Sequence, residues 1–146
     1  MATRLGLACV AYYFDTTWKE LSVARDVSLG LEAGEADVTT RGANGWELTI
    51  ATLKKGSVDI ELLYDTADPG FTALQTAYFT SAPIKMAFMD GPALTVGSTA
   101  QGLLAFFSVS KFSRDEPLQE ALKIKATVKP TYSPLLAPTW HTGELN

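Results

Sequence analysis

Histidine and cysteine are almost missing from this sequence: His141 and Cys9 each occur once among 146 residues. A single cysteine excludes a disulfide within the chain. A lone histidine in a proline-containing segment leaves no base for a serine triad, and a pair with Cys9 would need two distant segments to meet. No glycine-rich phosphate loop or calcium loop is present either. We therefore expect no enzyme activity, no catalytic residue, no metal site and no cofactor.

Basic charge is also scarce. Lysine and arginine total 12 against 16 acidic residues, which gives a formal net charge of −4. A protein that grips nucleic acid needs a basic surface, so this balance argues against that class. It is compatible with a surface that nucleic acid slides past. No apolar stretch approaches the roughly 20 residues that a membrane helix requires. The short apolar run before Cys9 is interpreted as part of a first strand rather than a signal segment, and the chain is expected to be made in the cytoplasm.

Alternation of apolar and polar residues dominates what is present, and it predicts a mainly β protein. The expected strands are 5–14, 20–31, 46–53, 57–65, 84–88, 103–112 and 122–128. About seven antiparallel strands would form a sandwich or barrel. Asp68 and Pro69 are typical of a helix start, which predicts one flanking helix near 69–79. Its buried side would carry Phe71, Leu74 and Tyr78.

The segment 46–65 predicts a hairpin that turns at Lys54-Lys55-Gly56. Its register would place Trp46 opposite Tyr64 in the core. The opposite side of this hairpin would be acidic and polar. It would carry Glu47, Thr49, Asp59 and Glu61.

Three polar or proline-spaced segments do not fit the predicted core: 32–44, 91–102 and the tail from 130. Loops of this length are uncommon in compact domains unless they have a function. We therefore divide the chain into a single β domain, 1–130, and an extended tail, 131–146. The tail carries exposed apolar candidates for docking on a neighbouring subunit: Leu135, Leu136 and Trp140.

Two functions of other classes stay open at this point. A β-barrel mouth can hold a small apolar molecule, which would make the protein a monomeric carrier. Asp59 and Glu61 lie two residues apart on a predicted strand, about 6.5–7 Å apart, a separation that can suit paired carboxylates of a glycan-cleaving enzyme. Acidic residues on the outside of a hairpin are more often simply solvated.

A family resemblance is carried by fragments in a consistent order. They are 25–29 (RDVSL), 35–42 (EADVTTRG), 45–47 (GWE), Leu53, 58–61 (VDIE), 64–66 (YDT), 68–71 (DPGF), Gly102, 112–118 (FSRDEPL) and 129–131 (KPT). Together they resemble phage tail tube proteins, also called major tail proteins, which are related to the tube proteins of type VI secretion systems. The resemblance is densest from 26 to 79 and does not extend beyond Ser133.

This resemblance implies a β-sandwich with a flanking helix, six copies of which close a ring and stack into a tube. The subunit would belong to the virion tail and give DNA a passage without binding it specifically. The implied partners are further copies of the chain, a tape measure protein, a tail terminator and baseplate or tail-tip proteins. An injection tube of the type VI or contractile kind is the alternative.

Two groups of residues receive roles on this basis. Glu47, Thr49, Asp59 and Glu61 are expected to face the lumen, where an acidic wall would repel DNA. An outer solvent-facing position is the alternative for this group. The long loop is expected to contact an adjacent subunit through Asp37, Thr39, Thr40 and Arg41. There the alternative is a turn held by threonine and aspartate hydrogen bonds.

Overall fold

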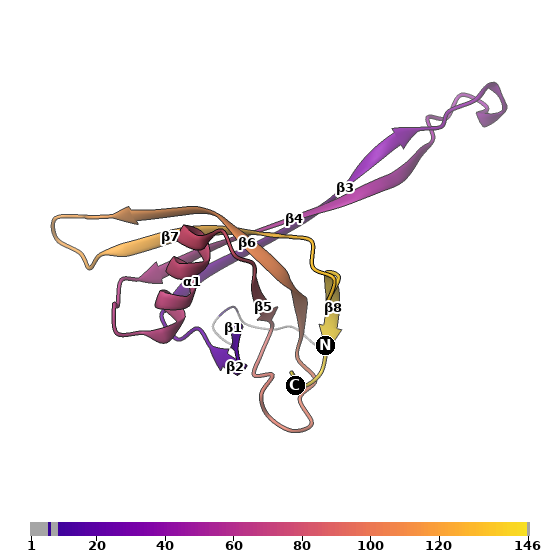
Figure 1. The fold of residues 1–146 in the computed structure, drawn as a ribbon. Coiled ribbons are helices and arrows are strands. Elements are labelled where there is room, and N and C mark those ends of the chain that lie inside the picture. The colour runs from indigo at the N-terminus through magenta and orange to yellow at the C-terminus, as the bar shows by residue number, and fades with distance from the viewer. Residues whose placement is uncertain (1–5, 7–8, 146) are drawn as a thin grey trace.

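The computed structural model describes residues 6 and 9–145, and within them one helix lies against an antiparallel sheet (Figure 1). The strands are β1 (Val10–Asp15), β2 (Thr17–Glu20), β3 (Ala24–Asp37), β4 (Thr49–Leu63), β5 (Ile84–Met89), β6 (Gln101–Asp115), β7 (Lys123–Pro130) and β8 (Thr139–Thr142). The helix α1 spans Pro69–Thr80, and a short 3₁₀ turn, η2, spans Arg41–Ala43. No helix among the described residues is both long and apolar enough to cross a bilayer.

The strands follow the order β2-β1-β5-β6-β7-β4-β3, and β8 pairs with β6 beside this path. β6 joins the two halves of the sheet: its first half pairs with β5 and its second half with β7. A bulge between Val109 and Lys111 lies in the second half. Because a bulge bends a strand and increases its twist, β6 can pass from one half of the sheet to the other.

The main core lies between these two halves. Alternate residues of β4 (from Val58) and β7 are buried, as the period of two predicts, whereas β5 is buried on both of its sides from Met86 to Met89. They meet in one cluster with apolar residues of β1, β6 and α1. Fully buried members include Val58, Ile60, Leu62, Met86 and Phe107. Burial of each such side chain contributes about 1.5–3 kcal/mol relative to exposure. The prediction of a mainly β, antiparallel fold with one flanking helix is confirmed.

The helix is confirmed almost to the residue, because its start signals are local. The Asp68 carboxylate accepts a hydrogen bond from the Phe71 backbone N–H at 3.0 Å, and Pro69 occupies the first turn. Phe71 and Leu74 are buried. The prediction that Tyr78 is buried is wrong: it is 37% exposed and stacks on Phe112, with ring centroids 5.9 Å apart. The helix covers one open end of the core (Figure 1).

A second, smaller core lies on the other side of β5 and joins distant parts of the chain. Tyr12 and Trp18 meet Met89, Leu104 and Leu145 there. The Tyr12 hydroxyl accepts a hydrogen bond from the Ala93 N–H at 2.9 Å, and the Leu145 N–H donates to the Ala93 carbonyl at 2.8 Å. The tail from 131 onward therefore folds back onto the body through β8 and Leu145.

The predicted hairpin within 46–65 is wrong. β4 runs unbroken from Thr49 to Leu63, and Lys54, Lys55 and Gly56 lie in its middle, paired with Ala33, Glu32 and Leu31 of β3. Gly56 gives room for a close approach and makes no turn, since a Cβ there would lie 2.9 Å from the Leu31 Cδ2. The hairpin partner of β4 is β3, so much of the predicted loop 32–44 is strand.

The predicted strand boundaries also differ at the N-terminal side. The strand expected over 5–14 is β1, which begins at Val10; residues 5, 7 and 8 lie outside the described residues. The strand expected over 20–31 begins at Ala24 and extends to Asp37. No residue of β3 is buried, so both sides of the strand admit polar residues and alternation does not mark where the strand ends.

Candidate assembly surfaces

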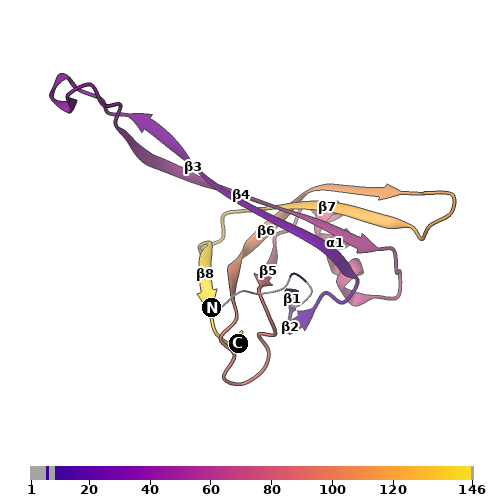
Figure 2. The ribbon, with the colours of Figure 1, turned by 180° about the vertical axis from the view of Figure 1, so that it is seen from behind.

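The outer part of the β3–β4 hairpin projects from the body as a two-stranded ribbon (Figures 1 and 2). We call residues 30–57 the arm. β3 is the last strand in the sheet order, and the last pair between β4 and β7 is Val58 with Val128. Among the described strands, none pairs with β4 from Thr49 to Ser57 except β3. The β3 edge of the arm is open because β3 is the last strand of the sheet. The β4 edge is open because β7 ends at Pro130, which has no N–H to donate.

The arm carries large apolar side chains without any core of its own. None of residues 30–57 is buried. Trp46 is 74% exposed and Leu53 is 79% exposed. The further exposed apolar side chains are Leu31, Val38, Leu48 and Ile50. A two-stranded ribbon alone is at best marginally stable in water, and a gathering of exposed apolar residues indicates an interaction surface. The prediction that Trp46 is core is therefore wrong, whereas Tyr64 packs edge-on against Phe71 at 5.2 Å.

Hydrogen bonds order the tip of the arm. The Asp37 carboxylate accepts from the Thr39 N–H at 2.8 Å, and the Thr39 hydroxyl accepts from the Leu48 N–H at 2.8 Å. Hydrogen bonding by Thr39 lowers the pKa of Asp37, and the side chain of Thr39 has a larger effect than its backbone. Asn44 and Gly45 turn the chain with φ angles of 54° and 85°. Glycine suits such a position because it has no Cβ to clash.

The structure brings together the residues predicted for a contact loop. Asp37, Thr39, Thr40 and Arg41 all lie at the tip, and all are exposed. Asp37 and Thr39 also make the turn hydrogen bonds that the alternative interpretation requires. Order in the turn and contact with a neighbour are compatible, because an ordered tip loses less conformational entropy on binding.

The four residues predicted to face the lumen are divided between two places. Glu47 and Thr49 lie at the far end of the arm, and Asp59 and Glu61 lie on the body. Thr49 and Asp59 belong to one strand, ten residues apart, which corresponds to roughly 33 Å. Basic residues also lie among the carboxylates on the side of the sheet that was predicted to be acidic. β7 places Thr127 and Lys125 beside Asp59 and Glu61.

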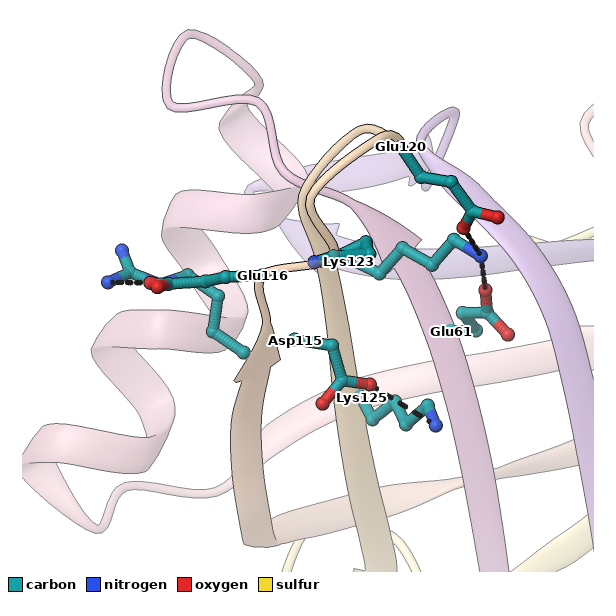
Figure 3. Close-up of a pocket in the computed structure, with 8 residues that line it drawn as sticks. Glu61, Asp115, Glu116, Glu120, Lys123 and Lys125 are labelled. Atoms are coloured by element: carbon teal, nitrogen blue, oxygen red, sulfur yellow. Dashed lines mark ion pairs between the residues drawn. The ribbon is translucent and has the colours of Figure 1, made fainter.

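Ion pairs connect the strands on this side of the sheet (Figure 3). Lys123 Nζ lies 3.8 Å from Glu61 and 3.1 Å from Glu120, and Lys125 Nζ lies 3.2 Å from Asp115. The Thr127 hydroxyl donates to Asp59 at 2.7 Å. An exposed pair such as Lys125–Asp115 contributes about 0–1 kcal/mol. Lysines accompany the carboxylates, so this surface has mixed charge.

This surface does not resemble an acid–base site. Arg114 lies 2.7 Å from Glu116 at the end of the same hairpin, so Glu61, Asp115, Glu116 and Glu120 each have a cationic neighbour. Among the described residues, no three His, Cys, Asp or Glu side chains gather as a metal ion would need. Asp59 and Glu61 do share one side of β4, as predicted, but Asp59 is exposed, and Glu61 lines a hollow of about 630 Å³ in which Lys123 and Lys125 lie beside the carboxylates (Figure 3).

A hollow of about 490 Å³ lies where β3 passes the ends of β1 and β5. Most of its lining is apolar: Val10, Ala11, Leu21, Val27, Leu29, Phe88, Met89 and Trp140. Glu20, Arg25 and Asp90 add charge, and Cys9 also lines it. Sequence reasoning missed this site, because its lining comes from segments that are far apart in the chain.

The apolar residues predicted to dock from the tail have different surroundings. Leu135 is 83% exposed. Leu136 packs on the second core. Trp140 is half exposed, and its indole Nε1–H donates to the Gln101 side chain at 3.1 Å. A contact of these residues with another subunit stays a prediction.

Comparison with known proteins gives a consistent result at the level of the fold. No protein-family model and no curated protein sequence matches the chain. Among solved structures, the tail of an empty gene transfer agent particle with C6 symmetry aligns over 95% of this chain and 99% of its own, with a TM-score of 0.75 and 12% identity.

The SPP1 tail tube aligns over 99% of this chain and 81% of its own, with a TM-score of 0.75 and 12% identity. A chain of the anti-feeding prophage baseplate aligns over 99% of this chain and all of its own, with a TM-score of 0.67 and 12% identity. At this identity the likeness is one of fold. The chain therefore has the fold that is found in these tail and tail-tube structures.

Proposed function

We propose that this protein is a structural subunit of a phage tail tube that works by self-assembly and catalyses no reaction. The observation that carries the proposal is the arm: an ordered ribbon with two open edges and exposed Trp46 and Leu53. Such a surface is a hazard for a monomer and becomes a joint when another copy covers it. The shared fold with the SPP1 tail tube supports the same function.

Stacked hexameric rings are the assembly that we propose. The arm and the body are different surfaces, so a contact between them is heterologous and generates rings or filaments. The C6 symmetry of the gene transfer agent tail supports six copies in each ring. The assembly would belong to the virion, with a tape measure protein, a tail terminator and baseplate or tail-tip proteins as its further partners.

Within such a tube, we assign Asp59 and Glu61 to the wall of the DNA channel and Glu47 and Thr49 to contacts of the arm. Lysines beside Asp59 and Glu61 would make the wall polar and balanced in charge. DNA could pass such a wall without finding a basic site that holds its phosphates. An injection tube without DNA is the second candidate, supported by the likeness to a chain of the anti-feeding prophage baseplate.

Electron microscopy and sedimentation across a concentration series test the proposal. The purified protein is expected to form hollow rings or filaments of uniform bore. A Trp46→Ser, Leu53→Ser double variant is expected to stay monomeric at the same concentrations with its unfolding temperature nearly unchanged, because neither side chain is buried. Leu118→Ser is the matched control, since Leu118 is 98% exposed but lies at the end of the β6–β7 hairpin.

A carrier function predicts the opposite behaviour. A protein that stays monomeric at high concentration and retains a small apolar molecule through purification would contradict self-assembly. Mass spectrometry under non-denaturing conditions would detect such a molecule.

A further inference from the structure

The arm and the hollow have complementary chemistry. The tip of the arm offers Trp46 and Leu48 as exposed apolar side chains, and the hollow is lined mainly by apolar ones. Its volume of about 490 Å³ is within the range of about 300–1,000 Å³ that is typical of binding pockets. Burying an aromatic side chain of this size removes about 150–250 Å² from water.

The charges of the two surfaces also match. Arg41 and Glu47 are exposed at the tip. Glu20 and Asp90 at the hollow can pair with Arg41, and Arg25 can pair with Glu47. Complementary charges of this kind fix the register of a contact and disfavour wrong partners.

A chain cannot fill its own hollow with its own arm. Leu29 of the hollow and Asp37 at the tip belong to the same strand, eight residues apart. An extended strand of that length spans roughly 26 Å. Because β3 is paired with β4 as far as Asp37 with Thr49, the arm cannot bend back without breaking its ladder. An arm that occupies this hollow therefore comes from a second copy of the chain.

We propose that the tip of the arm, residues 37–48, docks into the hollow of a second copy, with Trp46 as its apolar anchor. This inference rests on the proposed self-assembly and names the receiving surface. If the copy that receives an arm passes its own arm on to a third copy, the contact is heterologous and links copies into a ring or a filament.

Disulfide trapping tests this contact with the cysteine that the chain already has. Cys9 lines the hollow, and Glu47→Cys places a second thiol beside Trp46. Mild oxidation of the assembled variant is expected to give a ladder of linked copies on a non-reducing gel, reversed by dithiothreitol. A reciprocal contact would stop at dimers, which would overturn the heterologous arrangement.

Two controls separate docking from random collision. Glu47→Cys combined with Cys9→Ser removes the acceptor thiol and is expected to abolish the ladder. Leu118→Cys with Cys9 retained places a thiol on an exposed hairpin away from the arm and is expected to give no ladder. An equal ladder from Leu118→Cys would overturn the proposal. If Glu47→Cys prevents assembly, Thr40→Cys at the same tip takes its place.

Electron microscopy of the same samples distinguishes failure of the docking contact from failure of the tube function. Tubes without a ladder from either tip cysteine would overturn docking in this hollow and leave the tube function intact. Wild-type protein that forms no assembly would overturn the tube function itself.

A charge exchange gives an independent readout. Arg25→Glu is expected to raise the concentration needed for assembly several-fold, and Glu47→Arg in the same chain is expected to return that concentration to its original value.

Discussion

At some positions of this fold the neighbouring backbone lies so close that only glycine fits, and Gly102 is the strictest case. A Cβ at this position of β6 would collide with the Phe88 carbonyl oxygen of the neighbouring strand. Gly102→Ala is expected to lower the free energy of unfolding by about 1–3 kcal/mol, because the strands must move apart. Urea denaturation measures this loss. Gly30→Ala in β3 is the control, since its nearest contact would be an ordinary 3.9 Å.

Asp37 gives a prediction of pH dependence at the same scale. Its pKa in the folded protein is below the ordinary value of 3.8 because Thr39 hydrogen-bonds to the carboxylate. The stabilisation of the turn is therefore fully present above 3.8 and is lost as the pH falls through the lower folded pKa. Carboxyl carbon NMR shifts should titrate below 3.8, and Thr39→Ala should move the midpoint upward. A midpoint unmoved by Thr39→Ala would contradict this assignment, and Thr40→Ala is the control.

Among the elements, the helix depends on a cap that was visible in the sequence. Asp68→Ala is expected to lower the free energy of unfolding by about 1 kcal/mol, because the Phe71 N–H loses its acceptor. Asp68→Asn keeps an oxygen acceptor at the same place and should retain most of the stability. Thermal unfolding followed by circular dichroism measures both. Equal losses for the two variants would indicate that the charge of Asp68 matters and the cap does not.

Elements with local signals could be predicted from the sequence, and elements defined by distant partners could not. The start of α1 follows from Asp68 and Pro69, and the β7 pattern follows from alternation over 122–128. The hairpin over 46–65 failed because a lysine pair followed by glycine also occurs inside a strand that needs space for Leu31. The prediction for Trp46 failed because an apolar residue predicts burial, whereas Trp46 is 74% exposed in a single copy of the chain.

At the scale of the whole molecule, the C-terminal segment packs into the second core and so links distant parts of the chain. Leu145 is only 5% exposed and packs with residues of β1, β5 and β6. Leu145→Ala is expected to destabilise the protein by about 2 kcal/mol or more, since buried leucines lose about 2–5 kcal/mol on truncation to alanine. Leu135→Ala, at an exposed position of the same tail, should change stability by less than about 0.5 kcal/mol. Equal effects of the two would contradict a core role for Leu145.

The residues of the candidate site could likewise be predicted together only where they are neighbours in the chain. Asp37, Thr39, Thr40 and Arg41 were predicted together because they are neighbours in the chain, and they remain together at the tip. The lumen group was divided, because its grouping depended on the failed hairpin. The hollow could not be predicted at all, since Val10, Leu29 and Phe88 meet only after the sheet has folded.

The arm also gives any assembly a direction. If each arm fills the hollow of the next copy, one end of a finished stack presents bare arms and the other presents unfilled hollows. These two ends differ in shape and chemistry, so subunits add to them at unequal rates. A molecule that stops growth at one end cannot stop it at the other. Growth of such a polymer must therefore be stopped by two unlike caps, one shaped as a hollow and one shaped as an arm.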